Sequence, residues 1–558
     1  MVRRVFELVY KEVRGLHQAA YVLGLFAFGS QILALVRDRL LAHQFGAGME
    51  LDLYYAAFRI PDLLYVLFAS TLSVYVLIPF VAGRIKGEDS SKARELLSQI
   101  CTAFILIYCL LGAVMFIVAP YVLPLIFPGL ASHADRLVVI SRILLLQPLF
   151  LGVSSLFGVV TQLGRRFVLY AVSPLIYNVG IIVGVAVFYP LWGLNGLVIG
   201  VVLGALGHML VQLPLVQKSP LAFSFTVSIA WRELAEILRI SVPRALTLAM
   251  QQIVIAVLLG IASLMAVGSV SVFQLAYNLQ GVPLAIIGAS YSVAAFPFLA
   301  DLFAQKKMDV FRVHIVTALR HMIFWSVPAT GLIIVLRAQI VRVILGSGAF
   351  NWDDTRLTAA VLAVLSISLC AQAFNLLIVR AFYAGGHTRT PFLVTFFGSI
   401  FAIALSLAAY GAYAAHPEWS ASLGNTLRIG NVRGAEVVVL GLSYSLAICL
   451  QTAVLYLLAF KRFDVPSAWF LPNIGRALCA ALVGSSCAYG ALNLIVSGIN
   501  DTAFLGIFLQ GLAGGICGIA GVIVTYYLLR SPEMEEIYRA FHSRIFKNDV
   551  VAPQEDVL

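Results

Sequence analysis

Long apolar windows separated by short polar segments constrain the fold of this 558-residue chain more than any other feature. A helix needs about 20 consecutive apolar residues to cross the hydrocarbon core of a bilayer. Windows of this kind fall at about 18–42, 54–82, 98–119, 136–160, 167–189, 194–216, 236–265, 269–300, 315–343, 357–383, 391–414, 436–460, 472–497 and 503–529. The pattern predicts an all-α integral membrane protein with about fourteen transmembrane helices.

Composition excludes the main alternatives to a membrane protein. The chain is 61% hydrophobic and only 11% charged, whereas soluble domains carry roughly 25% charged residues. A soluble enzyme, a disordered chain and a nucleic-acid-binding protein are therefore excluded. The formal net charge of +11 has to be examined first as a feature of membrane topology.

The positions of lysine and arginine predict the orientation. An even number of spans places both termini on the same side of the membrane. With the N-terminus inside, 25 of the 37 cationic residues fall in inner segments, and the outer loops hold only Arg136, Arg342, Arg356, Arg428 and Arg433. The positive-inside rule then predicts that both termini are cytoplasmic, so most of the net charge needs no polyanionic partner.

The basic segment before the first window has two interpretations. A cleaved secretory signal is disfavoured, because the apolar run exceeds a signal core of about 7–15 residues and lacks a convincing small-x-small cleavage site. Apolar residues at helical spacing between Val5 and Leu16 favour a short helix on the inner interface. A charged flank that only fixes the orientation is the alternative.

Catalytic and metal-binding motifs are absent from the sequence. All seven cysteines lie inside apolar windows without a CxxC pair, which is typical of small core residues. The nine histidines form no HxxxH pair, and no GxSxG, Walker or HExxH pattern occurs. We therefore expect a protein that is not an enzyme and that uses no cofactor or metal.

An internal repeat relates the two halves of the chain. Pro79–Ala82 (PFVA) corresponds to Pro297–Ala300 (PFLA) at an offset of 218, Gly48 to Gly268 at 220, and Gly164 to Gly386 at 222. Each half holds six windows, so both copies enter the membrane in the same orientation, as in transporters that open a central path to either side in turn. Chance similarity between apolar helices is the alternative.

The repeat and the windows together predict the domain organisation. The expected parts are an interfacial segment (1–17), a first lobe (18–216), a cytoplasmic linker (217–235), a second lobe (236–414), an external loop with a twelfth span (415–460), two C-terminal helices (461–529) and a cytoplasmic tail (530–558). The two C-terminal helices fall outside the repeat and need a role of their own.

Seven arginines remain inside the windows after the loops have been counted. Arg39, Arg142 and Arg337 lie near helix ends, where their side chains can reach the interface. An arginine at a helix centre costs about 2.5–3.5 kcal/mol on insertion scales and usually faces water or a partner. The four others, Arg37, Arg59, Arg244 and Arg380, therefore predict a path for an anion, since guanidinium binds phosphate oxygens in bidentate fashion.

Carboxylates are rare in the windows and gather around the first hairpin. Asp52 and Asp62 flank Arg59, and Pro61 favours a kink beside it. Asp38 follows Arg37 directly, so the alternative for Arg37 is a neutralised cation at the outer end of the first helix.

Two long blocks of sequence resemble a known family. Residues 30–64 read SQILALVRDRLLAHQFGAGMELDLYYAAFRIPDLL and are similar to the opening hairpin of the MurJ/MviN family of lipid II flippases. The block Gly346–Pro391, from GSGAFNWDDTRLTAAVL to VRAFYAGGHTRTP, resembles that family's ninth-to-eleventh helix region. The resemblance covers essentially all of the expected spans.

The resemblance implies a fold, an activity and a location. The fold is that of MOP-type exporters, with two six-helix lobes around a cationic cavity and two C-terminal helices that shape a groove for a polyprenyl tail. The activity is translocation of undecaprenyl-pyrophosphate-linked peptidoglycan precursor to the outer leaflet of the bacterial cytoplasmic membrane by alternating access. The implied partners are lipid II and membrane lipids, with other cell-wall synthesis proteins as further candidates and no nucleic acid.

Alternative functions remain open at this stage. One is export of another polyprenyl-linked oligosaccharide, or of a small molecule by a MOP-type exporter. Another is a membrane scaffold or a flippase-like protein that has lost transport. The two C-terminal helices argue against a soluble substrate, because multidrug relatives typically have twelve spans.

The resemblance also carries over individual residues. Arg37 and Asp38 match the family's Arg-Asp pair on the first helix, Asp52 an acidic residue that begins the second, and Ser271 a serine that opens the eighth. Gln31, Tyr65 and Asn278 stand where many members have arginine. The candidate substrate-binding residues are Arg37, Asp38, Arg59, Arg244, Gln31, Asn278, Ser271, Asp52 and Arg380. We expect Arg244 and Arg37 to replace the missing cations in binding pyrophosphate.

Overall fold

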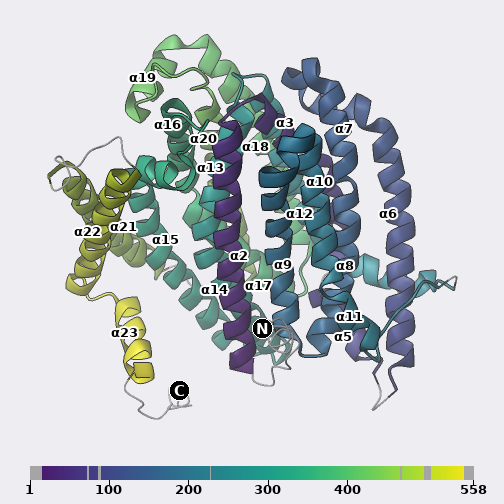
Figure 1. Ribbon diagram of the computed structural model, residues 1–558. Coiled ribbons are helices and arrows are strands. Elements are labelled where there is room, and N and C mark those ends of the chain that lie inside the picture. Colours follow the sequence, from purple (N-terminus) through teal and green to yellow (C-terminus); the bar gives the residue numbers. More distant parts are fainter. Residues whose placement is uncertain are drawn as a thin grey trace. The chain divides into compact units, whose positions relative to one another are not determined.

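The computed structural model describes residues 16–71, 74–85, 89–226, 228–465, 468–494 and 504–545. Regular structure in these ranges consists of α-helices with short 3₁₀ and π segments (Figure 1), which confirms the all-α prediction. The expected interfacial helix lies outside the described residues except for its last two positions, and so does the tail from residue 546 onward.

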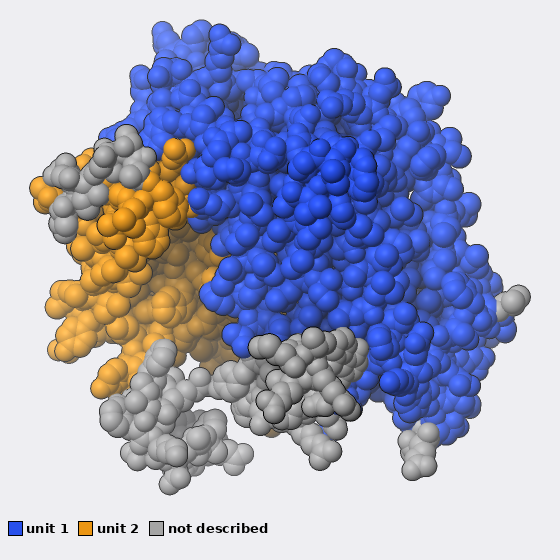
Figure 2. All heavy atoms as spheres, viewed as in Figure 1, with its two compact units in different colours: residues 1–279, 344–361, 388–447 blue, residues 280–343, 362–387, 448–558 orange. Residues whose placement is uncertain are grey.

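The chain divides into two compact units whose segments alternate along the sequence. Unit 1 comprises residues 1–279, 344–361 and 388–447, and unit 2 comprises residues 280–343, 362–387 and 448–558 (Figure 2). These boundaries differ from those of the two lobes expected from the repeat. The lobes remain a prediction.

Unit 1 contains most of the N-terminal helices. They are α2 (Leu16–Phe45), α3 (Met49–Ala57), α4 (Arg59–Thr71), α5 (Val74–Ala82), α6 (Ser91–Ile126), α7 (Ala134–Leu144), α8 (Leu146–Leu163), α9 (Phe167–Val183), α10 (Tyr189–Leu210), α11 (Leu213–Lys218), α12 (Trp231–Ser263) and α13 (Ser269–Pro283), followed later by α16 (Trp352–Ser366), α18 (Arg389–Ala415), α19 (Pro417–Leu427) and α20 (Val437–Phe463). α2 packs along α9, α9 along α10, and α12 against α4 and α18.

Unit 2 contains the remaining helices, and α13, α16 and α20 continue into it. Its own helices are α14 (Ser290–Ala304), α15 (Met308–Leu345), α17 (Leu369–Ala384), α21 (Phe470–Leu494), α22 (Phe504–Leu528) and α23 (Pro532–Ile545). α14 packs against α17, and the last two apolar helices, α21 and α22, pack along one another (Figure 1).

Ten helical segments among the described residues are long and apolar enough to cross a membrane, or eleven if the bent pair α16–α17 is one span. The windows 167–189 and 194–216 form one helical run in this count, although Gly193 breaks it with a φ of 60°. The window 54–82 is divided among α3, α4 and α5, each shorter than a span. A multi-pass architecture is thus confirmed, while the count of fourteen and the orientation remain predictions.

Local geometry supports the internal repeat. α3 begins at Met49 and α13 at Ser269, an offset of 220 residues. After α8 and after α17 the chain turns through a residue in the left-handed conformation, Arg165 with φ 54° and Gly386 with φ 72°, an offset of 221 residues. Gly386 is thus matched by Arg165 and not, as the sequence comparison predicted, by Gly164, whose φ is −77°. Equivalent positions of the two halves therefore start and end helices in the same way.

Glycines allow α9 and α10 to pack in close contact. A Cβ added at Gly180 would lie 2.3 Å from Cα of Gly204, and one added at Gly200 would lie 2.3 Å from Cα of Gly184. Small residues spaced four apart permit this approach of two membrane helices, which gain van der Waals contact in place of a hydrophobic driving force. The glycine stripe therefore fixes the position of α9 in unit 1.

Replacing Gly200 by alanine should loosen this pair. We expect Gly200→Ala to lower the free energy of unfolding by about 1–3 kcal/mol, because the new methyl group forces the two backbones apart. The matched control is Gly411→Ala on α18, where a Cβ meets nothing within 4 Å. Thermal unfolding of the purified protein in detergent measures both, and equal melting temperatures would contradict the packing argument.

A buried ion pair connects the C-terminal helix α23 with α15 in unit 2. Glu533 is only 3% exposed, and its Oε1 accepts a hydrogen bond from Nε of Arg320 at 2.7 Å. Its Oε2 accepts one from the Ser531 hydroxyl at 2.6 Å. Burial by itself would raise the pKa of Glu533, but the bonds from Ser531 and Arg320 outweigh it and lower the pKa.

The stability that Glu533 contributes should depend on pH. Because its pKa is lowered by folding, the contribution is fully present above the ordinary value of 4.5 and disappears as the pH falls through the lowered value. We expect Glu533→Gln to destabilise the protein by about 1–3 kcal/mol at pH 7, and by progressively less as the pH falls through the lowered pKa of Glu533. Melting curves across pH test this. Glu535→Gln, at an exposed pair with Arg539, should change little at any pH.

Candidate functional site

Unit 1 contains a polar cavity of about 190 Å³ between α2, α3, α4, α9 and α13. The residues that line it are Arg37, Leu41, Tyr54, Tyr55, Phe58, Arg59, Asp62, Tyr177, Ile181, Gln274 and Asn278. Three of the candidates from the sequence, Arg37, Arg59 and Asn278, thus meet at one cavity although they lie far apart in the chain. Two of them are cations that can donate hydrogen bonds to an anion, and Asp62 adds a carboxylate to the lining.

Arg37 is held from two sides. Its Nε donates a hydrogen bond to Oδ1 of Asp38 at 2.9 Å, and its Nη1 donates to Oδ1 of Asn178 on α9 at 3.2 Å. Nδ2 of Asn178 in turn donates to the Ser30 hydroxyl at 3.3 Å. The guanidinium therefore links α2 with α9, and 21% of its side chain remains exposed.

Asp38 extends this network to α13. The residue is 3% exposed, and its Oδ2 accepts a hydrogen bond from Nδ2 of Asn278 at 3.1 Å. Oδ1 of Asn278 accepts another from Nε2 of Gln274 at 2.7 Å. A continuous chain of hydrogen bonds therefore runs from α9 through α2 to α13. Asp38 does not itself line the cavity, and it acts there through Arg37 and Asn278.

Arg59 is more buried but less tightly paired. It begins α4 directly after the break at Phe58, and its Nε donates to the Tyr55 carbonyl at 3.1 Å. Its Nη2 lies 3.8 Å from Oδ2 of Asp62, well beyond the 2.7–2.9 Å typical of a strong charge-assisted hydrogen bond. Only 8% of Arg59 is exposed. Both cavity arginines therefore lie beside a carboxylate, as the sequence predicted for Arg37 and Arg59.

Asp52 and Ser271 bind each other rather than line the cavity. The Asp52 carboxylate accepts hydrogen bonds from the backbone N–H of Gly268 at 2.7 Å, from that of Ser271 at 2.8 Å and from the Ser271 hydroxyl at 2.5 Å. A carboxylate at this place caps the free N–H groups and favours the positive end of the helix dipole. Asp52 thus fastens α3 to the start of α13.

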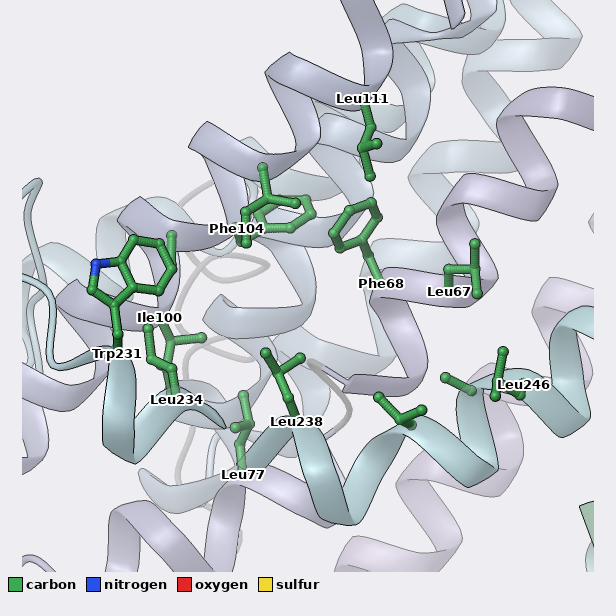
Figure 3. A pocket seen from close by; sticks show the side chains of 14 residues that line it. Leu67, Phe68, Leu77, Ile100, Phe104, Leu111, Trp231, Leu234, Leu238 and Leu246 are labelled. Atoms are coloured by element: carbon green, nitrogen blue, oxygen red, sulfur yellow. The ribbon is translucent and has the colours of Figure 1, made fainter. Parts of the chain in front are cut away.

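Three other candidates lie elsewhere. Arg244 is half-buried on α12, and its neighbours Ala245 and Leu246 help to line a second, wholly apolar pocket of about 240 Å³ between α4, α5, α6 and α12 (Figure 3). Gln31 is half-buried on α2 but is not among the residues that line the polar cavity. Arg380 lies on α17 in unit 2.

The three arginines that the sequence places near helix ends donate hydrogen bonds to backbone carbonyls. Arg39 donates to the carbonyl of Ile344 at 3.3 Å, and Arg337 to that of Ile334 at 2.8 Å. Arg142 donates to the carbonyl of Phe116 at 2.9 Å and places its guanidinium carbon 4.3 Å from the centre of the same residue's ring. These contacts satisfy the charge locally and agree with the predicted role.

Several cavity residues carried no signal in the sequence. Tyr54, Tyr55, Tyr177 and Gln274 line the cavity, and Asn178 orients Arg37. Tyrosine and neutral amides are ordinary in membrane helices, so hydropathy does not single them out. The spacing Gln274–Asn278, one helical turn apart on the helix that carries Ser271, is the one pattern that could have pointed to a polar face.

Removing the Asp52 carboxylate should destabilise the fold without changing the cavity. We expect Asp52→Ala to lower the free energy of unfolding by about 1–3 kcal/mol, because two buried N–H groups and a hydroxyl lose their acceptor. Ser271→Ala, which removes only one of the three bonds, should cost less. Melting temperatures rank the variants. A stable Asp52→Ala variant that fails to bind substrate would instead place Asp52 in the binding site.

Comparison with known proteins identifies the family. A family model described as lipid II flippase MurJ matches residues 41–514. A Thermotoga maritima protein named probable lipid II flippase MurJ is 28% identical over 390 residues, which cover 70% of this chain and 78% of the relative. Both confirm the resemblance read from the sequence.

Solved structures show the same fold. A structure described as lipid II flippase MurJ in an inward closed conformation aligns with a TM-score of 0.72 at 21% identity, covering 91% of this chain and 99% of that one. An inward-facing multidrug resistance MATE family transporter of the MOP superfamily aligns with a TM-score of 0.61 at 15% identity over 78% of this chain and 94% of that one. The fold is therefore MOP-like, and the apolar helices mark a multi-pass protein of the bacterial cytoplasmic membrane. On the extent of the family match, this chain belongs to the lipid II flippase MurJ family.

Proposed function

We propose that this protein translocates lipid II, the undecaprenyl-pyrophosphate-linked peptidoglycan precursor, from the inner to the outer leaflet by alternating access. The observation that carries the proposal is the cavity lined by Arg37 and Arg59 within a bundle of apolar helices. Permanent cations in such a place are costly unless they serve a polar path. The family to which the chain belongs supplies the substrate class, and a transporter of this kind needs no catalytic residues.

The geometry suggests how the pyrophosphate binds. Its oxygens accept hydrogen bonds from guanidinium groups, which are donors only. Arg59 is the readier ligand, because its partner Asp62 lies 3.8 Å away and holds it weakly. Arg37 keeps part of its surface exposed beside the cavity. The incoming anion therefore competes with Asp38 and Asp62 for the two arginines.

The size of the cavity limits what it can hold at one time. About 190 Å³ is less than the roughly 300–1,000 Å³ of ordinary small-molecule sites. The space suffices for the pyrophosphate and the adjoining part of one sugar, whereas a disaccharide with its peptide needs a wider opening. The proposed cycle therefore includes a state in which the helices around the cavity separate.

The C-terminal pair α21–α22 is the proposed contact for the polyprenyl tail. The two helices approach closely at Gly484, where a Cβ would lie 2.9 Å from the carbonyl oxygen of Gly518. Their outer faces expose large apolar side chains, among them Leu478, Leu482 and Ile516. A lipid-linked substrate needs an apolar surface for its tail as well as a polar cavity for its pyrophosphate, which gives these helices a role outside the repeat.

A second candidate function uses the same site. Asn278 and Tyr65 stand where the resembling family often has arginine, and Asn278 lines the cavity as a neutral group. This departure from the family pattern makes export of another polyprenyl-pyrophosphate-linked oligosaccharide the alternative, since the pyrophosphate is common to both substrates. Transport assays with lipid II and with a polyprenyl-linked sugar of different composition distinguish the two.

Substitution of the cavity arginines should abolish transport. We expect Arg37→Ala and Arg59→Ala to lower the initial rate of lipid II flipping in proteoliposomes at least tenfold, which corresponds to about 1.4 kcal/mol, and to fail to rescue a strain depleted of its own flippase. Each change removes a charge-assisted contact to the pyrophosphate and leaves a carboxylate, Asp38 or Asp62, without its arginine.

The Arg244→Ala variant is compared with the two cavity variants. It tests the expectation that Arg244 binds the pyrophosphate together with Arg37. If the polar cavity alone binds the pyrophosphate, this variant rescues growth at a normal expression level. If Arg244→Ala fails to rescue growth while Arg59→Ala functions normally, the pyrophosphate is bound by Arg244 and not by Arg59. Normal function of Arg37→Ala and Arg59→Ala together would exclude the cavity as the anion site.

A further inference from the structure

Two side-chain oxygens at the polar cavity are buried without a hydrogen-bond partner. They are the hydroxyl of Tyr55 and Oε1 of Gln274, and both residues line the cavity. Tyr55 is 6% and Gln274 is 8% exposed, so bulk water does not satisfy these atoms. Buried polar groups are nearly always paired in native proteins, and an exception requires an explanation such as a ligand that the site is built to bind.

The carboxylate of Asp38 determines which side-chain atom of Gln274 remains without a hydrogen-bond partner. A carboxylate only accepts hydrogen bonds, so Asn278 must turn its amide nitrogen toward Asp38. The oxygen of Asn278 then faces Gln274, which must present its own amide nitrogen. The orientation of both amides is therefore fixed by the network, and the remaining atom of Gln274 is an acceptor.

An acceptor cannot serve the pyrophosphate. Ionised phosphate oxygens are themselves acceptors, and they are matched by the guanidinium groups of Arg37 and Arg59, which only donate. Oε1 of Gln274 needs an O–H or N–H group instead. Beside a pyrophosphate in a lipid-linked sugar, the groups of this kind are the hydroxyls and amide N–H of the first sugar. The Tyr55 hydroxyl, which both donates and accepts, suits the same neighbour.

We propose that Gln274, assisted by Tyr55, is a specificity-determining residue that recognises an O–H or N–H group of the sugar attached to the pyrophosphate. The inference rests on the proposed function and deepens it. The arginines bind the anion common to all polyprenyl pyrophosphates, whereas Gln274 separates a sugar-bearing lipid from the bare pyrophosphate carrier. A site built to hydrogen-bond a substrate group rejects the analogue that lacks it, because the site's polar atoms are then left unpaired.

The test compares two lipids on the full-length protein in nanodiscs. The equilibrium dissociation constants of lipid II and of undecaprenyl pyrophosphate, which has no sugar, are measured for wild type and for Gln274→Leu. We expect the variant to bind lipid II about tenfold more weakly, while its affinity for undecaprenyl pyrophosphate stays within about twofold. Tyr55→Phe removes a single oxygen atom and should shift the ratio in the same direction by a smaller factor.

Gln147→Leu is the matched control. Gln147 also carries a buried Oε1 without a partner and is 4% exposed, but it is not among the residues that line the cavity. Its replacement should leave the ratio of the two affinities unchanged. A change in this ratio as large as that of Gln274→Leu would show a general effect of the substitution and overturn the inference.

The remaining outcomes separate the inference from the proposed function. Unchanged affinities for both lipids in Gln274→Leu would mean that the unpaired oxygen contacts neither lipid, and equal weakening of both would mean that it does not distinguish the sugar. Either result overturns the inference while the function stands. Wild-type protein that binds neither lipid would overturn both. If Gln274→Leu does not fold, Tyr55→Phe decides the same question.

Discussion

The Asp38 carboxylate is the group on which the polar interior of this protein depends. One of its oxygens holds Arg37 and the other holds Asn278, so α2 and α13 share a single acceptor. Through Arg37 the network reaches α9, and through Asn278 it reaches Gln274. Because a carboxylate cannot donate, it also fixes the direction of every amide beyond it. One acidic side chain therefore joins three helices and decides which polar atoms remain available at the cavity.

Asp52 is a shared hydrogen-bond acceptor for backbone N–H groups, as Asp38 is for side chains. It accepts hydrogen bonds from the backbone N–H of Gly268, directly before α13, and from that of Ser271 in the first turn of α13, where no residue inside the helix provides an acceptor. Gly268 fits there because its φ is 93° and a Cβ would lie 2.0 Å from the carbonyl oxygen of Ala47. Two segments that begin equivalent helices of the repeat thus meet through one cap. Asn278 and Gln274 lie further along the same helix.

The sequence predicted those parts of the site that carry charge. Arg37 and Arg59 were recognisable because a cation in an apolar window is costly, and the structure brings them to one cavity. Arg244 gave the same signal, yet it is not among the cavity residues. The sequence could not predict this, because hydropathy does not show which face of α12 is turned inward. Gln274 and Tyr55 were missed because neutral polar groups cost little in sequence statistics. Their importance depends on partners that only the folded chain defines.

The fold was predictable at the level of class but less so in its details. Long apolar windows and the family resemblance led to a helical, MOP-like membrane protein, which the structural comparisons support. The windows did not show that the stretch from 54 to 82 is broken into separate helices, or that α9 continues through a π segment, Gly184–Phe188, toward α10. These features arise where proline, glycine and tertiary packing override the average hydropathy of a window.

The pairing of both cavity arginines with carboxylates has a consequence for energetics. The formal charge of Arg37 is cancelled by Asp38, and that of Arg59 by Asp62. The unloaded cavity therefore moves little net charge across the transmembrane voltage. Moving one elementary charge across that voltage changes the energy by about 2.3 kcal/mol per 100 mV. A bound pyrophosphate adds negative charge, which an inside-negative voltage drives outward. In the proposed cycle the voltage therefore acts on the loaded step and leaves the return of the empty carrier almost unaffected.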